Sequence, residues 1–439
     1  MQDNHRPGNI DKRIAVPRLR VAIIGGGIGG IALAIALSRR TDIELSLFEA
    51  ASAFSEIGAG VSFGANAVAA IRHLGLEAAY RRVADGSPAP DEDVWFEWRR
   101  ARDAGYLGVT RSPGCGQSSV HRADFLDAMV ACLPDGIAQF GKRCCGVSQG
   151  NGQPEAVFED DSRITADVII GADGIKSVVR AHVLPSAEGV DIAPRFCGTY
   201  AYRGLIEQAA LAERLAGIGA DARLVCLPQM YLGTDRHVLT FPVKKGQIIN
   251  VVAFVTDPQR VRPTTAITTS WVEAVSRAEL QQAFSDHGAA VHAVLEGIEA
   301  PTRWAMHDLP VLPRYHRRQV VIMGDAAHAT LPHQGAGAGQ ALEDALVLAG
   351  LLGDPRCDRS RVIDVLAAFD AVRRSRAGRV QTTSYAMGER YQGRVPNRGD
   401  DNARLAADLE TRFDWIWNFD PAQSVVEART LLGWHDTSA

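Results

Sequence analysis

The sequence has no cysteine pattern typical of a metal centre or of a redox-active disulfide. Its seven cysteines are an odd number at irregular spacing, and no C-x-x-C pair occurs among them. The adjacent Cys144 and Cys145 are more typical of a partly buried strand than of a redox pair. We therefore expect no metal site and no dithiol chemistry.

A long hydrophobic run is also missing, because no apolar stretch reaches the roughly 18 residues that span a bilayer. The polar segment 1–18 has no apolar core of a signal peptide, so we expect a disordered leader there and a cytoplasmic protein without a membrane partner. A net charge of -4 leaves no basic surplus for nucleic acid. The 439 residues suffice for two or three domains, and both a monomer and a homodimer remain open.

The order of strand and helix patterns predicts an α/β fold with a second domain inserted into the first. Residues 19–190 and 302–388 alternate between short aliphatic strands and helices, which is typical of a Rossmann-type domain. Residues 191–301 are expected to form an inserted α+β domain with an antiparallel sheet, and 389–439 a helical tail. The inserted domain is predicted from strand patterns at 196–206, 223–232, 237–243 and 247–256 and a helical stretch at about 268–298.

A glycine-rich hexamer at residues 25–30 fits the dinucleotide-binding fingerprint G-x-G-x-x-G. It follows an expected strand and opens an expected helix, and an acidic residue ends the next strand. Gly25 permits the tight turn, Gly27 lets the backbone approach a pyrophosphate, and Gly30 allows close helix–strand packing. Ile28 lies within this cofactor-binding turn, and Glu49 is expected to bind the adenosine ribose. The fingerprint alone does not separate FAD from NAD.

Two further motifs place carboxylates at the ends of parallel strands, where open α/β sheets bind ligands. Asp173 lies in the GADG segment, and Asp325 in the GDAAH segment is positioned to accept from a ribityl hydroxyl. The following glycine-rich loop contains Gly337 and Ala338 and runs into a helix, whose N–H groups can stabilise negative charge on a reduced flavin. An NAD dehydrogenase has no need of this second site, so the three motifs together favour FAD.

The three motifs, in this order and at these separations, resemble the single-component (group A) FAD-dependent aromatic hydroxylases. The resemblance covers about residues 19–385 and implies the fold of p-hydroxybenzoate hydroxylase, with non-covalent FAD. It also implies NADH as a transient co-substrate, O2 as oxidant, and a small aromatic acid as substrate. An arginine on an early helix contacts the cofactor in this family, and Arg122 occupies the matching place.

Six shorter segments resemble one branch of that family, which converts salicylate to catechol and carbon dioxide with NADH and O2. An alternative is a hydroxylase that keeps the carboxylate of another hydroxybenzoate, such as a 3-hydroxybenzoate 6-hydroxylase. A flavin disulfide reductase would need a second fingerprint and a cysteine pair, and a flavin module without turnover remains a further alternative. The segments are EIGAGVSFGANAV (56–68), DVWFEWRR (93–100), GQSSVHRADF (116–125), PQMYLG (228–233), LPHQGAGAGQ (331–340) and RFDWIWN (412–418).

Two histidines are candidates for a catalytic base near the substrate hydroxyl. His333 lies between the GDAAH motif and the glycine-rich loop, and a neutral imidazole has a suitable pKa for taking a phenolic proton. The alternative is that His333 only packs beside Pro332. His237, on the inserted sheet, resembles a substrate-site histidine of related benzoate hydroxylases, or it is a strand histidine bonded to backbone. His328 is expected to bond locally.

The substrate pocket is expected to need a cation for the carboxylate and an apolar wall for the ring. Arg203 and Lys244 are candidate cations, although a solvated face explains either as well. Met230 and Tyr231 are candidates for the wall, with core packing as the alternative. Two tryptophans of the segment 93–100 alternate along a strand, so one is expected to face the core and the other the pocket or solvent.

Overall fold

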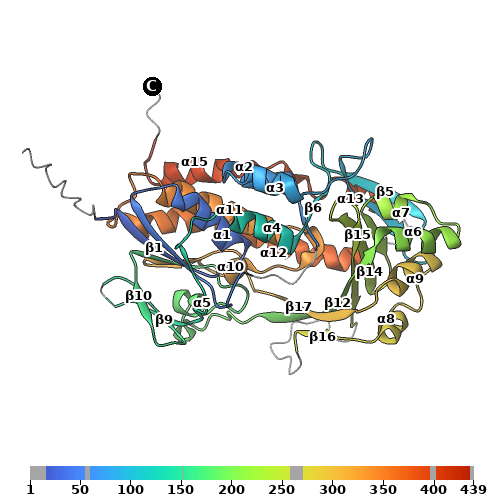
Figure 1. Cartoon of the computed structure of the whole chain (residues 1–439), viewed down its shortest axis with the longest axis horizontal. Helices are drawn as coiled ribbons and strands as arrows, with labels where there is room; N and C mark the ends of the chain where they lie inside the picture. Colours follow the sequence, from blue (N-terminus) through green and yellow to red (C-terminus); the bar gives the residue numbers. More distant parts are fainter. Residues whose placement is uncertain (1–15, 55–59, 151, 258–269, 396–401, 436–439) are drawn as a thin grey trace, which may run out of the picture.

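The computed structural model describes residues 16–54, 60–150, 152–257, 270–395 and 402–435. Most of the expected leader, residues 1–15, lies outside these ranges, as does the start of the segment 56–68. The molecule is elongated and has two lobes (Figure 1). One lobe is built on a parallel sheet, and the other on a larger, mostly antiparallel sheet.

The first lobe contains a six-stranded sheet in the order β18-β19-β11-β1-β2-β7. All pairs are parallel except that of the edge strand β18. The central strands are short and almost wholly buried, as expected for a sheet covered on both faces. The strands predicted from the sequence on either side of the glycine-rich hexamer are confirmed. The bounds are β1 (Leu19–Ile24), β2 (Ile43–Phe48), β7 (Ala138–Gln139), β11 (Val168–Gly171), β18 (His316–Arg317) and β19 (Val320–Ile322).

Helix α1 is the centre of this lobe, and nine of its residues are buried. It packs against β2 and against α11, and α11 in turn contacts α2, α12 and α15. In Figure 1 the long helix α12 runs from this lobe toward the second one. The helices are α1 (Ile28–Ser38), α2 (Ala65–His73), α3 (Glu77–Val83), α4 (Arg122–Val130), α5 (Val179–Val183), α10 (Asp325–His328), α11 (Gly337–Leu352), α12 (Val362–Tyr391), α13 (Asn402–Thr411), α14 (Asp414–Trp417) and α15 (Ala422–Leu431), with 3-10 turns η1 (Ser186–Glu188) and η2 (Pro332–Gln334).

The second lobe contains an eight-stranded sheet in the order β16-β17-β12-β15-β14-β13-β4-β5. Its pairs are antiparallel except for β13 with β4. Because side chains alternate along a strand, one face of the sheet packs under α6, α8 and α9 while the other faces the first lobe. The bounds are β4 (Val94–Arg100), β5 (Tyr106–Arg111), β12 (Arg195–Glu207), β13 (Gln229–Leu232), β14 (Arg236–Val243), β15 (Ile248–Thr256), β16 (Val272–Ala274), β17 (Thr302–Asp308), α6 (Gln208–Gly217), α7 (Arg223–Cys226), α8 (Arg277–Ala283) and α9 (Ala289–Glu296).

The structure corrects the predicted domain boundaries in two places. Strands β4 and β5 lie inside the segment 19–190 that was assigned to the first domain, and β17 opens the segment 302–388, yet all three belong to the second sheet. Two predicted elements are also partly wrong, because α7 begins the expected strand 223–232 and β16 lies in the expected helical stretch 268–298. The pairing of β4 with β13 joins distant parts of the chain, so local periodicity does not reveal it.

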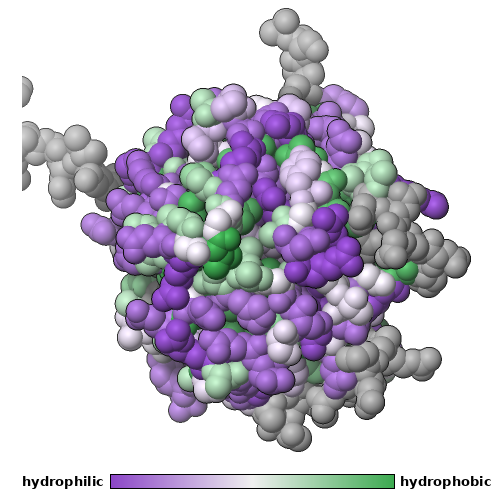
Figure 2. Space-filling model, turned by 90° about the vertical axis from the view of Figure 1, so that its right-hand side faces the viewer, coloured by the Kyte–Doolittle hydropathy of each residue, from purple (hydrophilic) through white to green (hydrophobic). Residues whose placement is uncertain are grey.

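The fold also contains two small sheets and a group of C-terminal helices. The small sheets pair β3 (Gly60–Phe63) with β6 (Ser118–His121), and β9 (Glu155–Phe158) with β8 (Cys144–Ser148) and β10 (Arg163–Thr165). The predicted C-terminal tail is helical in its described part, with α13 against β5 and α15 against α11 and α12. None of the helices in the described ranges is both long and apolar enough to cross a membrane. On the face shown in Figure 2, hydrophilic side chains predominate and hydrophobic ones form small separate patches.

Candidate active site

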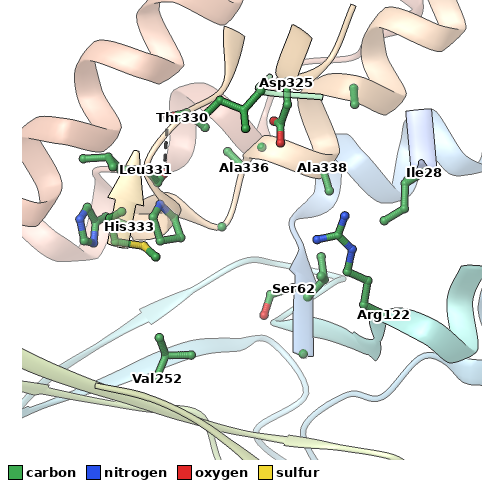
Figure 3. A pocket seen from close by; sticks show the side chains of 18 of the residues that line it. Ile28, Ser62, Arg122, Val252, Asp325, Thr330, Leu331, His333, Ala336 and Ala338 are labelled. Atoms are coloured by element: carbon green, nitrogen blue, oxygen red, sulfur yellow. Dashed lines mark hydrogen bonds between the residues drawn. The ribbon is translucent and has the colours of Figure 1, made fainter. Parts of the chain in front are cut away.

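A cavity of about 440 Å³ lies where the two lobes meet. The first lobe contributes the start of α1, the GADG turn, Asp325 and the glycine-rich loop that leads into α11. The second lobe contributes side chains from β4, β12, β13, β14, β15 and β17. Figure 3 shows Ile28, Arg122, Asp325 and Ala338 grouped toward one end, while His333 lies toward the other. The two ends are called the cofactor end and the substrate end below.

The glycines of the fingerprint have the conformations that a tight phosphate-binding turn requires. Gly25 has a φ of +108°, and a Cβ there would lie 2.3 Å from the carbonyl oxygen of Ala172. A Cβ on Gly30 would lie 2.1 Å from the carbonyl oxygen of Gly25, so helix and turn are in close contact. In contrast, apart from the adjoining residues of the chain, no atom of the described residues lies within 4 Å of a Cβ on Gly27, which lines the cavity at the N-terminus of α1. The space beside Gly27 therefore suits a ligand phosphate.

Glu49 lies just after β2 and braces the fingerprint turn. One of its carboxylate oxygens accepts from the backbone N–H of Gly26 and the other from that of Ala51, each at 2.8 Å. Each oxygen retains a second lone pair, so these bonds leave acceptor capacity for a ribose hydroxyl. The expected ribose contact stays a prediction.

The remaining cofactor candidates reach the cavity from three elements. Asp325 is the first residue of α10, and its exposed carboxylate lines the cavity. Gly337 and Ala338 begin α11, so their backbone N–H groups lie at the positive end of a 16-residue helix. Arg122 begins α4, and Figure 3 shows its guanidinium reaching toward Ala338 and Ile28.

Asp173 lies in the turn after β11 and is hydrogen-bonded within that turn. Its carboxylate accepts from the hydroxyl of Ser177 at 2.6 Å and from the backbone N–H of Val178 at 2.7 Å. Its neighbours Ala172 and Gly174 line the cavity, but Asp173 does not. Asp173 therefore shapes the turn that follows β11, and a direct contact of its carboxylate with the cofactor stays a prediction.

The two candidate histidines lie side by side at the substrate end, although they are far apart in sequence. Their ring centroids are 5.2 Å apart, and both residues are buried and line the cavity. His237 stacks on Phe254 at 4.3 Å, and its Nδ1 accepts a 3.4 Å hydrogen bond from Nε2 of Gln392. The backbone carbonyl of His333 accepts from the hydroxyl of Tyr391 at 3.0 Å, which fixes the η2 turn to α12.

Both imidazoles are neutral near neutral pH, because burial disfavours the charged form. Burial lowers the pKa of His333 to about 4. Burial, together with His333, holds the pKa of His237 well below its ordinary value. Within the described residues, Nδ1 of His333 and Nε2 of His237 are buried without a hydrogen-bond partner. Two ring nitrogens are thus available to a ligand.

Arg203 supplies positive charge to the same cavity. It lies on β12, with its guanidinium carbon 4.7 Å from the ring centroid of Trp304. Burial and the nearby charge of Arg122 lower the pKa of Arg203 to about 10, so it stays a cation at neutral pH. In the part of the chain that the structure describes, no carboxylate forms an ion pair with Arg203, and its Nε has no partner. An anionic ligand would supply the missing counter-charge.

Three other candidates lie outside the cavity. Met230 lines it, but Tyr231, the next residue of β13, points to the opposite face and packs in the core under the helices, so its predicted substrate contact is wrong. Lys244 lies on the turn after β14, 4.0 Å from a carboxylate oxygen of Asp124. His328 bonds Asp344 on α11 at 2.6 Å, which makes it structural, although its partner is not local.

Two groups of residues at the site were missed in the sequence. Aromatic and apolar side chains from β4, β14 and β15 form much of the wall of the substrate end: Phe96, Leu239, Val252 and Phe254. Of the two tryptophans of β4, one of which was expected to face the core and the other the pocket or solvent, Trp95 lines the cavity. A buried ion network lies under the glycine-rich loop, where Arg373 of α12 bonds Glu343 and Asp344 of α11 at 2.6 and 2.7 Å. Two adjacent acidic residues in an otherwise apolar helix were the signal that could have revealed this network.

The cofactor end fits FAD. It offers a phosphate-sized space beside a glycine, two helix N-termini for negative charge, and a carboxylate at Asp325 for a hydroxyl. Arg122 and Arg203 add positive charge for an anionic flavin or substrate. The neutral, largely apolar substrate end suits an aromatic ring.

Comparison with known proteins agrees with this geometry. A family model for the FAD binding domain matches residues 18–384. Two Pseudomonas putida proteins are named salicylate hydroxylase. The first is 54% identical to this chain, over 95% of the chain and 96% of the relative. The second is 52% identical, over 97% of the chain and 97% of the relative. A solved structure described as a salicylate hydroxylase substrate complex is 48% identical and superposes with a TM-score of 0.87, covering 94% of this chain and 98% of its own.

Proposed function

Because the chain belongs to the FAD-binding domain family and is a flavoprotein monooxygenase, we propose that it hydroxylates salicylate with loss of the carboxyl group. The products are catechol and carbon dioxide. The balanced reaction takes salicylate, NADH, O2 and two protons to catechol, carbon dioxide, NAD+ and water. Bound FAD supplies hydride acceptance and oxygen activation, and the residues of the chain bind, orient and deprotonate the substrate.

The observation that carries the proposal is a pair of neutral, buried histidines in a cavity that is also lined by an unmatched cation, Arg203. An aromatic acid with an ortho hydroxyl places a hydroxyl and a carboxylate on one edge of a flat ring. His333 accepts the hydroxyl proton at Nδ1, because this nitrogen is buried without a partner among the described residues. The substrate carboxylate raises the low pKa of His333, since a nearby negative charge favours the imidazolium. Deprotonation makes the ring more electron-rich at the carbon to be hydroxylated.

Arg203 is proposed to bind the substrate carboxylate. Arg203→Gln is expected to weaken salicylate binding by about 10- to 100-fold, because a hydrogen bond to a charged group is lost. Arg203→Lys should recover part of the affinity by restoring the charge. The measurement is the KM for salicylate together with the FAD content of each variant.

The matched control is Arg303→Gln, on the neighbouring strand β17. Arg303 already forms ion pairs with Glu273 and Glu279, both at 2.9 Å, and does not line the cavity. Its replacement should leave the KM for salicylate unchanged. If Arg203→Gln loses FAD but keeps its KM, Arg203 serves the cofactor and not the substrate.

The test of the proposed function is product analysis with the FAD-loaded protein. Salicylate, NADH and oxygen are supplied, and catechol, trapped carbon dioxide, peroxide and NADH are quantified. Catechol and carbon dioxide equal to the NADH consumed establish decarboxylative hydroxylation. NADH consumption that yields only peroxide makes salicylate an effector, and other hydroxybenzoates are then tested for products that keep the carboxylate. No stimulation of NADH oxidation by salicylate rejects the proposal.

A further inference from the structure

Trp95 brings an unmatched hydrogen-bond donor to the substrate end of the cavity. It is the second residue of β4, is 1% exposed, and its indole ring lines the cavity. Its Nε1 is buried and has no acceptor among the residues that the structure describes. Buried donors in native proteins are almost always paired, so this N–H is expected to find its acceptor in a ligand.

The indole N–H of Trp98, on the same strand, has a hydrogen-bond acceptor within the protein. Trp98 is also fully buried, and its Nε1 donates to the hydroxyl of Thr110 at 2.8 Å. That hydroxyl in turn donates to the carbonyl oxygen of Leu409 at 2.7 Å. The fold therefore satisfies one indole of β4 internally and leaves the other for the cavity.

The C-terminal segment, residues 402–435, packs against the indole of Trp95 and holds it in place. The rings of Trp417 and Phe413 lie 4.7 and 6.3 Å away, and these two rings stack on each other at 5.0 Å. The loop that carries His333 also lies close, because a Cβ on Gly335 would be 3.5 Å from Cζ2 of Trp95. The indole is thus in contact with the C-terminal aromatic residues and with the loop of the candidate base.

We propose that Nε1–H of Trp95 donates a hydrogen bond to an anionic oxygen of the aromatic substrate. This inference rests on the proposed function. The wall around the indole is apolar, with Phe96 and Met230 among its members, so it offers the N–H no side-chain acceptor. A carboxylate or phenolate oxygen is a strong acceptor and needs a donor when it leaves water. Trp95 is therefore a substrate-positioning residue that the C-terminal segment orients.

The test compares Trp95→Phe with Trp98→Phe in the FAD-loaded protein. Binding is followed without NADH, from the change in flavin absorption as salicylate is added, so the readout does not require turnover. Trp95→Phe is expected to raise the Kd for salicylate by about 10- to 100-fold. Trp98→Phe removes an N–H that is bonded internally, so it should lower thermal stability and leave the Kd within about twofold.

Benzoate, which has only the carboxylate, and phenol, which has only the hydroxyl, identify the substrate oxygen that accepts the hydrogen bond from Trp95. A penalty for Trp95→Phe that persists with benzoate and disappears with phenol assigns the carboxylate; the reverse assigns the hydroxyl oxygen. If Trp95→Phe fails to fold, the isosteric benzothienylalanine at position 95 removes only the N–H.

An unchanged Kd for all three ligands overturns the role of Trp95. If the unmodified protein turns over salicylate in that case, the proposed function stands and only this inference fails. An unmodified protein that binds none of the three ligands overturns both.

Discussion

Gly27→Val is expected to give a folded protein that purifies without flavin. The fold tolerates the side chain because the described residues, apart from the chain neighbours, place no atom within 4 Å of a Cβ at this position, and its φ of -75° is ordinary. The branched side chain would instead fill the space at the N-terminus of α1 where the pyrophosphate of FAD is expected. We expect FAD affinity to fall by roughly 100-fold or more, or about 3 kcal/mol. The visible absorption of bound flavin and a melting curve measure the two effects separately.

Gly217→Val is the matched control. This glycine ends α6 on the second lobe, also has open space around a Cβ, and lies outside the cavity. The control should stay yellow, at a cost in stability of less than about 1 kcal/mol. Gly30→Ala would not serve, because its Cβ would collide with the carbonyl of Gly25 and the whole turn would shift. A Gly27→Val protein that retains a full complement of FAD would contradict the expected pyrophosphate position.

The cofactor end could be predicted from the sequence because its determinants are local. A buried strand, a glycine turn and a helix follow each other within residues 19–38, and each leaves a pattern that a short window detects. The same holds for the strand β19, for Asp325 and for the start of α11. Residue type also predicted the strands of the inserted sheet, since β12, β14 and β15 are long and rich in β-branched and aromatic residues.

The substrate end could not be predicted to the same depth, because its residues meet only through distant pairing. His237 and His333 come together when β14 of the second sheet packs beside the loop before α11. Trp95 reaches the cavity because β4 pairs with β13, and it is oriented by rings from the C-terminal segment. The wrong assignment of Tyr231 also has a physical reason, because its side chain follows the alternation of β13 to the far face of the sheet.

His333→Ala is expected to keep FAD but to lose most of the hydroxylated product. General-base catalysis contributes about 100- to 10,000-fold, so catechol formation should fall by a factor in that range. NADH oxidation should continue with release of peroxide, because the substitution leaves the cofactor end intact. The measurement is the ratio of catechol to NADH consumed, with peroxide assayed in parallel. His292→Ala, on α9 at the outer side of the second sheet, is the control and should keep a normal ratio.

The pH dependence separates a base from a histidine that only packs. Since burial lowers the pKa of His333 to about 4, its neutral form persists from neutral pH down to about that value. As pH falls through about 4 the imidazole is protonated and can no longer accept the hydroxyl proton, whereas an ordinary histidine would lose this capacity near 6.5. The variant should regain product on addition of free imidazole, which can replace the missing base in the space left by the side chain. If the ratio of catechol to NADH stays normal in His333→Ala, His333 is not the base. His237 would then be the candidate, because its ring lies 5.2 Å from that of His333 and its Nε2 has no hydrogen-bond partner among the described residues.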